Sequence, residues 1–337
     1  MRRYIFILFD IIYIMKTITL EEHYASPSFI EGPGKGLREH AKNFTGPRAN
    51  LLEQLVDVGD RRIGDMDKAS IDMQILSLTS PGVEQLEGDE AVKIARSSND
   101  FLADAVKKNP TRFAAFATLP TIIPDKASAE LERTIREYGF KGAVINGHIQ
   151  GRYLDDKFFW PIFKKAEMLD VPIYLHPTQP PQAVLDTYYG GFNQTVSYMF
   201  ANAGWGWHIE TAVHVLRMIL GGVFDEYPKL QIVIGHLGEA LPFMINRVDN
   251  MTPEMTKLKH PVSYYLKNNI HYTFSGFNFV PTFVDLLSQV GVDRIMFSSD
   301  YPYAQMSEAR AFLDKLPVSL EDKEKIAHGN AERLFKL

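Results

Sequence analysis

The sequence predicts an α/β fold built as a (β/α)8 barrel, and three observations support this. Eight short runs rich in β-branched and aromatic residues recur along the chain. Most of these runs are separated by longer stretches with helical periodicity. Four of the runs end in polar residues that could bind a metal or transfer a proton. Eight strands alternating with helices over about 300 residues are typical of such a barrel, and a doubly wound open sheet is the alternative.

Each expected element follows from its own pattern. The expected strands are residues 16–23, 72–78, 113–120, 141–148, 171–177, 231–239, 270–277 and 294–302. The expected helices between them include residues 89–108, 125–138, 157–169, 208–226 and 280–290. Gly139 is expected to end the second of these helices, because glycine tolerates the left-handed conformation of a helix C-cap. No internal repeat or interdomain linker is found, so residues 15–337 are expected to form a single domain.

The composition excludes several classes of protein. The chain is 45% hydrophobic, 23% charged and 12% aromatic, as in soluble globular proteins, and its formal net charge is −5. A general nucleic-acid surface would need a basic patch, which this balance argues against. The absence of cysteine excludes disulfides, thiolate catalysis and cysteine-ligated zinc. It also fits a reducing cytoplasm.

The first fourteen residues resemble a signal peptide, with Arg2 and Arg3 ahead of an apolar stretch. Asp10 interrupts that stretch, no small-residue cleavage site follows, and the stretch is too short to span a bilayer. We expect residues 1–14 to be an upstream extension, with Met15 as the natural start. An uncleaved membrane anchor is the alternative, but no stable membrane insertion is expected.

The stretch "TLEEHY" places two carboxylates beside a histidine at the end of the first expected strand. Residues two apart share a face of a regular strand, so Glu21 and His23 should point together, opposite to Leu20. Glu22 is then expected to turn outward. The stretch alone fits either a solvated strand end or half of a metal site.

Other strand ends favour the metal site. His176, His236 and Asp300 lie at the ends of the fifth, sixth and eighth expected strands. The carboxyl ends of the strands of a barrel meet at one face, where barrel enzymes build their active sites. Polar residues at the same end of four runs are hard to attribute to chance. Glu21 and His23 are therefore expected to be two ligands of a divalent metal.

This constellation resembles the amidohydrolase superfamily, and within it the aminocarboxymuconate-semialdehyde decarboxylase-like branch. The resemblance rests on "LEEH", "VPIYLHP", "GVFDEYPKLQIVIGHLGE", "DRIMFSSDYP" and "NAERLFKL", and it covers the chain from about Lys16 to Leu337. Many members of the superfamily carry His-x-His on the first strand. This chain carries Glu-x-His, a form shared with the dihydroxybenzoate (γ-resorcylate) decarboxylases. The resemblance is therefore strongest to these enzymes.

The resemblance implies one divalent cation, Zn2+ or Mn2+, held by Glu21, His23, His176 and Asp300. The two carboxylates offset the charge of the cation, and mixed nitrogen and oxygen ligands suit either metal. No lysine stands at a strand end where a carbamylated bridging ligand would be expected, which favours one metal. A phenol oxygen beside a carboxylate would be a natural bidentate ligand for such an ion.

The implied reaction needs a proton donor, and Asp300 and His236 are the candidates. Glu239 follows His236 by three residues and is expected either to orient the imidazole of His236 or to act only as a first-turn helix acid. His208 and His214 are not assigned to the site. They lie six apart on one expected helix, instead of the three or four residues that would make a ligand pair.

A substrate carboxylate would be attracted by a cation. Arg247 and Arg62 are the candidates, and Arg62 lies in a segment similar to one that supplies a catalytic arginine in the aminocarboxymuconate enzyme. Either could instead be an ordinary ion-pair residue. Asn146 and His148 end the fourth strand on the active face, and His148 could equally be a structural loop histidine. Trp205 and Trp207 are candidate aromatic walls for a flat substrate, with core packing the expected role of one of them, and Trp205 is the one assigned to the site.

These features predict a metal-dependent, non-oxidative carboxy-lyase that acts on a small hydroxylated aromatic acid. It would protonate the ring carbon bearing the carboxylate and release CO2. A hydrolase or hydratase acting on a small carboxylic or lactone substrate at the same site is the first alternative, and a non-catalytic barrel that binds metal or carboxylates is the second. The resemblance also implies a homodimer or homotetramer, with a small aromatic carboxylate as ligand and no nucleic-acid partner.

Overall fold

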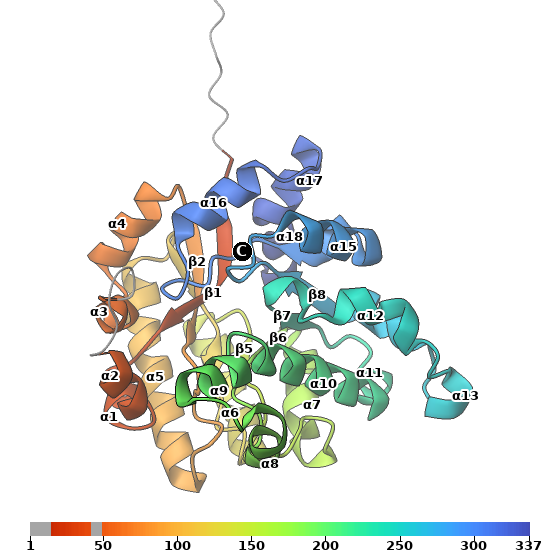
Figure 1. The fold of residues 1–337 in the computed structure, drawn as a ribbon. Coiled ribbons are helices and arrows are strands. Elements are labelled where there is room, and N and C mark those ends of the chain that lie inside the picture. Colours follow the sequence, from red (N-terminus) through yellow and green to blue (C-terminus); the bar gives the residue numbers. More distant parts are fainter. Residues whose placement is uncertain (1–14, 42–48) are drawn as a thin grey trace, which may run out of the picture.

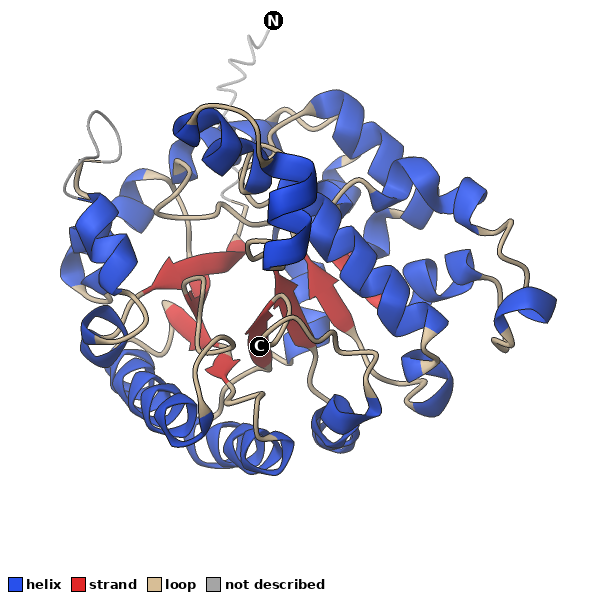
Figure 2. Cartoon of the chain, turned by 60° about the horizontal axis from the view of Figure 1, so that its bottom comes forward, coloured by secondary structure: helices blue, strands red, loops and turns tan. Residues whose placement is uncertain are grey.

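The computed structural model describes residues 15–41 and 49–337, which form a ring of parallel strands surrounded by helices (Figure 1). Figure 2 shows the strands around the centre and the helices outside them. This arrangement confirms the predicted (β/α)8 barrel. The expected extension at residues 1–14 lies outside the described residues.

The strands form two parallel sheets that together close the barrel. They are β1 (Ile18–Tyr24), β2 (Met73–Leu78), β3 (Phe113–Ala115), β4 (Ala117–Thr118), β5 (Ala143–Asn146), β6 (Ile173–His176), β7 (Ile232–Ile234), β8 (Ile270–Thr273) and β9 (Ile295–Met296). One sheet has the order β1-β2-β3 and the other the order β4 to β9. β3 and β4 are two halves of one barrel strand, interrupted at Phe116, whose N–H still bonds to the Leu76 carbonyl oxygen of β2. A bridge between Leu20 and Ser298 joins β1 to the segment after β9.

Side chains that point inward fill the barrel. Successive strands contribute one cluster, because alternate residues of a strand face the same side. Phe335 of the final helix belongs to this cluster and packs edge-on against Phe116. The inward cluster consists of Ile18, Leu20, Ile75, Ala114, Phe116, Val144, Tyr174, Val233, Met296, Ala331 and Phe335. Polar residues lie at the carboxyl ends of the strands.

A larger apolar layer lies between the strands and the helices. The longer helices are α5 (Gly88–Lys108), α6 (Pro124–Tyr138), α7 (Trp160–Leu169), α10 (Gly206–Leu220), α12 (Leu241–Val248), α15 (Val280–Val290) and α16 (Met306–Asp314). The shorter ones are α1 (Pro27–Glu31), α2 (Lys35–Ala41), α3 (Leu51–Val56), α4 (Asp60–Lys68), α8 (Gln182–Val184), α9 (Gln194–Ala201), α11 (Val223–Glu226), α13 (Pro253–Thr256), α14 (Val262–Asn268), α17 (Leu320–Glu324) and α18 (Asn330–Phe335). Short turns are η2 (Lys157–Phe159), η3 (Leu185–Tyr189), η4 (His236–Gly238), η5 (Val292–Arg294) and η6 (Lys325–Gly329).

The helices expected from periodicity are all present. Gly139 caps α6 with φ 69°, which is the left-handed conformation that its sequence position predicted. Residues 157–169 form η2 followed by α7, and residues 208–226 divide at a glycine pair into most of α10 and all of α11. None of the helices in the described part of the chain is long and apolar enough to cross a membrane.

Candidate metal centre and active site

Strand β1 departs from regular alternation at Glu21, one of the expected metal ligands. Glu21 has a φ of 59°, and the register with β2 shifts between Thr19 and Glu22. This bulge resets the alternation, so that Leu20 and Glu21 both point into the barrel. The expectation that Glu21 lies opposite to Leu20 is therefore wrong. Glu21 and His23 nevertheless converge on one point, as expected.

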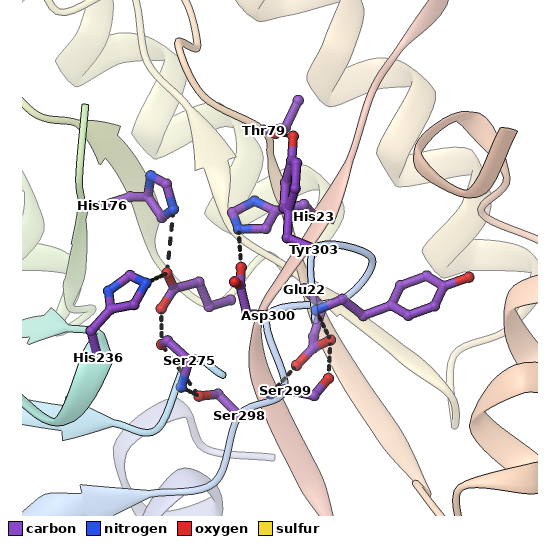
Figure 3. Close-up of polar contacts among 12 residues, drawn as sticks. Glu22, His23, Thr79, His176, His236, Ser275, Ser298, Ser299, Asp300 and Tyr303 are labelled. Carbon is purple, nitrogen blue, oxygen red and sulfur yellow. Dashed lines mark hydrogen bonds and ion pairs between the residues drawn. The ribbon is translucent and has the colours of Figure 1, made fainter. Parts of the chain in front are cut away.

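His23, His176 and Asp300 lie close together (Figure 3). The candidate ligand atoms of Glu21, His23 and His176 lie within 4.8 Å of one another. The His176 Nε2 lies 3.3 Å from Glu21 Oε1, and the His23 Nε2 lies 3.2 Å from Asp300 Oδ1. Glu21, His23 and His176 are buried, whereas 18% of the Asp300 side chain is exposed. Asp300 is therefore the most exposed of the four residues.

The two oxygens of Glu21 have different surroundings. Oε2 accepts hydrogen bonds from the hydroxyl groups of Tyr174 and Ser275. Oε1 is buried and has no well-aligned hydrogen-bond donor among the described residues. A buried carboxylate oxygen that lacks a hydrogen-bond donor is costly, so a cation is the natural group to complete it.

The residues present fit a single divalent metal. Two carboxylate groups and two imidazole Nε2 atoms come together from β1, the end of β6 and the segment after β9, and this donor set suits zinc or manganese. Glu21, His23, His176 and Asp300 would hold the ion.

The electrostatics also favour a cation at this point. Burial by itself would raise the pKa of Glu21, but the imidazoles of His236, His176 and His23 hold it well below its usual range. Burial lowers the pKa of His23, and the neighbouring His176 lowers it further. An ionised carboxylate beside a neutral imidazole is the state in which both groups bind metals.

Glu22 does not reach solvent as expected. It turns away from the barrel interior but is fully buried between the strands and the helices. Its Oε1 accepts from the Ser299 N–H at 2.9 Å, and its Oε2 accepts from the Ser299 hydroxyl at 2.7 Å and from the Tyr301 N–H at 3.3 Å. Burial raises the pKa of Glu22 to about 7, despite these donors. Glu22 thus fixes the segment that carries Asp300.

His236 belongs to a second buried cluster beside the first. Its Nε2 lies 3.7 Å from Glu21 Oε1, and its Nδ1 lies 2.7 Å from Glu239 Oε1. Of the two alternatives for Glu239, the contact with His236 is therefore present. Burial alone would lower the pKa of His236, but Glu239 and Glu21 raise it to about 10. The other oxygen of Glu239 lies 2.6 Å from the Nδ1 of His208, a histidine that the sequence pattern left unassigned.

Arg62 lies behind the site and is not available to a substrate. The side chain on α4 is completely buried, and its guanidinium donates to the backbone carbonyls of Asp57, His23 and Gln54. It also lies over the Tyr301 ring, 4.9 Å from its centroid. The prediction that Arg62 binds substrate is corrected, because the helix directs the guanidinium toward carbonyl groups. Arg62 supports the end of β1 instead.

We expect Arg62→Met to lower the free energy of unfolding by roughly 3 kcal/mol or more, because several buried carbonyls lose their donor. Urea unfolding would measure this loss. Arg61→Met is the matched control, since Arg61 pairs with Glu53 near the surface and should change stability by less than about 1 kcal/mol. If Arg62→Met left stability intact but raised KM about tenfold or more, Arg62 would bind substrate after all.

The remaining predicted substrate-binding residues, Arg247, Asn146 and Trp205, lie in different surroundings. Arg247 is exposed on α12 and is not part of either buried cluster. Asn146 is fully buried beside His176, with which it is paired in the β5–β6 register. Neither polar atom of its side chain has a hydrogen-bond partner among the described residues.

Trp205 is 51% exposed, whereas the Trp207 ring lies edge-on to His176 at 6.3 Å. The aromatic wall next to His176 is therefore Trp207.

His148 has local partners for both ring nitrogens. Its Nε2 lies 3.1 Å from the Gln179 carbonyl oxygen, and its Nδ1 accepts from the Gly151 N–H at 3.0 Å. These contacts tie two loops together, which fits the structural alternative.

The sequence pattern left out several residues that shape the site. Tyr174 could have been found, because it precedes His176 by two residues and must share its face of β6. Ser275 follows the end of β8 and could have been found in the same way. No sequence signal indicated His208, because its partner Glu239 lies 31 residues away.

Comparison with known proteins identifies the family. Residues 56–337 match the amidohydrolase family. The chain belongs to the amidohydrolase family. It is 37% identical over 333 residues to the γ-resorcylate decarboxylase of Polaromonas sp., an alignment that covers 95% of this chain and 98% of the relative.

Solved structures of similar proteins agree with this family assignment. A 2,6-dihydroxybenzoate decarboxylase complexed with 2,6-dihydroxybenzoate superimposes with a TM-score of 0.86 at 36% identity, covering 96% of this chain and 100% of the other. The dihydroxybenzoic acid decarboxylase of Polaromonas sp., with bound manganese and the inhibitor 2-nitroresorcinol, gives a TM-score of 0.87 at 36% identity. That alignment covers 96% of this chain and 97% of the other.

Proposed function

We propose that this amidohydrolase is a metal-dependent, non-oxidative decarboxylase of a small hydroxylated aromatic acid similar to dihydroxybenzoate. The observation that carries the proposal is the convergence of Glu21, His23, His176 and Asp300 at the carboxyl ends of the barrel strands. The close similarity to γ-resorcylate decarboxylases over nearly the full length of both chains directs that chemistry toward decarboxylation.

The proposed cofactor is one divalent ion, Mn2+ or Zn2+, held by these four residues. When bound, the cation supplies Lewis-acid charge that favours the phenolate form of a substrate and fixes its ring. Manganese in a similar decarboxylase structure supports Mn2+. We also propose a cytoplasmic location and a homodimer or homotetramer, which fit the absence of cysteine and the resemblance to oligomeric enzymes.

The chain's own residues would move the proton. Asp300 is the proposed donor because it is the partly exposed carboxyl group of the cluster. The proton from its carboxyl group would form a C–H bond at the ring carbon that bears the substrate carboxylate. The bond from that carbon to the carboxylate then breaks, its electrons restore the aromatic ring, and CO2 leaves. Asn146 and Trp207 line the approach to His176 and would contact the ring or its hydroxyl groups.

A panel of hydroxybenzoates, assayed with manganese or zinc, tests the proposal. We expect a dihydroxybenzoate to be consumed, with one equivalent of CO2 and one of the corresponding phenol formed. Chelator-treated protein should lose this activity and regain it when the metal is added back. Substrate loss can be followed by absorbance and CO2 by a coupled bicarbonate assay.

A hydrolase or hydratase acting at the same site is the alternative. It predicts conversion of lactones or unsaturated acids without CO2 release. That result, together with no turnover of any hydroxybenzoate or muconate-type acid, would overturn the proposed reaction. Metal binding without turnover of any substrate would instead favour a non-catalytic barrel.

A further inference from the structure

We infer that His208 is a positioning residue, which holds Glu239 in place and thereby aims His236 at the carboxylate of Glu21. The inference deepens the proposed function, on which its kinetic consequence rests.

The turn that carries His236 is costly to form. His236, Leu237, Glu239 and Ala240 all have φ values between 51° and 64°. Residues other than glycine reach this left-handed region at a cost of roughly 1 kcal/mol each, because the Cβ atom crowds the backbone. Such a turn persists only where contacts from other elements hold it. Its anchors therefore decide where the His236 ring points.

The carboxylate of Glu239 is the main side-chain anchor of this turn. It is fully buried, and its two oxygens are divided between two imidazoles. Oε1 lies 2.7 Å from His236 Nδ1, and Oε2 lies 2.6 Å from His208 Nδ1. His208 belongs to the first turns of α10, so this contact links the turn to a separate element. Without it, one buried oxygen of Glu239 would lose its donor.

Both ring nitrogens of His208 have a partner. Its Nε2 lies 3.1 Å from the Ala203 carbonyl oxygen, which can only accept a hydrogen bond. The imidazoles of His236 and His208 hold the pKa of Glu239 below its usual range, against the effect of burial. The two contacts of His208 together fix the orientation of its ring. The Phe277 ring packs against His208 at 5.0 Å and against His236 at 5.2 Å, which fixes the two rings relative to each other.

Two variants of matched shape separate this role from simple packing. His208→Asn keeps an N–H donor near the position of Nδ1, whereas His208→Leu has a similar volume and no donor. We expect His208→Leu to lower kcat about tenfold or more with little change in KM, as for loss of a group that orients an active-site residue. His208→Asn should recover most of this activity. His214→Leu is the control, because His214 is buried on the same helix but bonds to the Leu154 N–H.

Histidine-selective 15N NMR gives a readout that does not depend on turnover. The wild-type protein should show a strongly hydrogen-bonded proton on His236 Nδ1, which faces Glu239. His208→Leu should shift or remove the His236 signal, and His208→Asn should keep it. A wild-type spectrum without a hydrogen-bonded proton on His236 Nδ1 would overturn the inference, and this test needs no variant to fold.

Equal kinetic losses in His208→Asn and His208→Leu, with the His236 signal unchanged in both, would also overturn it. Wild-type protein that turns over no hydroxybenzoate would defeat the proposed function. The NMR comparison would still decide whether His208 positions His236.

Discussion

Replacing Asp300 with asparagine is expected to lower kcat for the decarboxylated substrate by about 10²- to 10⁴-fold, the usual contribution of a group that transfers a proton. Asparagine has the same shape but carries no acidic proton. Steady-state rates of CO2 release, measured at saturating manganese, would show the loss. Because three other ligands remain, the variant should still bind about one equivalent of metal.

Metal content distinguishes the two roles proposed for Asp300. If activity and metal are lost together and excess manganese restores the rate, Asp300 acts as a ligand and not as the donor. Asp249→Asn is the matched control, since the Asp249 carboxylate bonds only to Ser263 among the described contacts. A rate for Asp300→Asn within tenfold of the wild-type rate would contradict the proposed proton transfer.

Glu21→Gln should have the largest effect on metal binding. The amide lacks the negative charge, and its NH2 group would face either the hydroxyls of Tyr174 and Ser275 or the imidazole of His176. Loss of a group behind a ligand already costs about 10- to 100-fold in affinity, so loss of the ligand charge should cost about 10²-fold or more. Isothermal titration with Mn2+ and elemental analysis of the purified protein would measure this.

Glu130→Gln is the control for removing a buried carboxylate as such. Glu130 pairs with Arg133 on α6, away from the metal cluster, so its loss should leave metal affinity unchanged. Circular dichroism would confirm that both variants are folded. If Glu21→Gln bound manganese as tightly as the wild type, the proposed ligand set would be wrong.

Much of the candidate site could be predicted because it depends on local patterns. Strand alternation and the common direction of parallel strands are enough to bring His23, His176 and Asp300 to one end of the barrel. The three-residue spacing from His236 to Glu239 indicated their hydrogen bond as one of two alternatives, and the structure contains it. In each case the pattern involves residues close together in the chain, or a general rule of the fold.

Other features depend on contacts that no local pattern encodes. Arg62 lies on a helix whose rotation directs its guanidinium to backbone carbonyls, and neighbouring packing decides that rotation. Trp207 rather than Trp205 faces His176 for the same reason: the two lie at the start of α10 and point in different directions. His208 acquires its role only because the fold brings it next to Glu239.

By itself, the sequence determined the barrel, the order of its strands and the side chains that collect at its open end, because hydrophobic periodicity and parallel connections leave few other folds. Only the tertiary structure decided the direction of individual side chains. Glu21 shows the difference most clearly. Its left-handed backbone reverses the alternation of β1, and this conformation is held by hydroxyl groups from β6 and the segment after β8, far away in the chain.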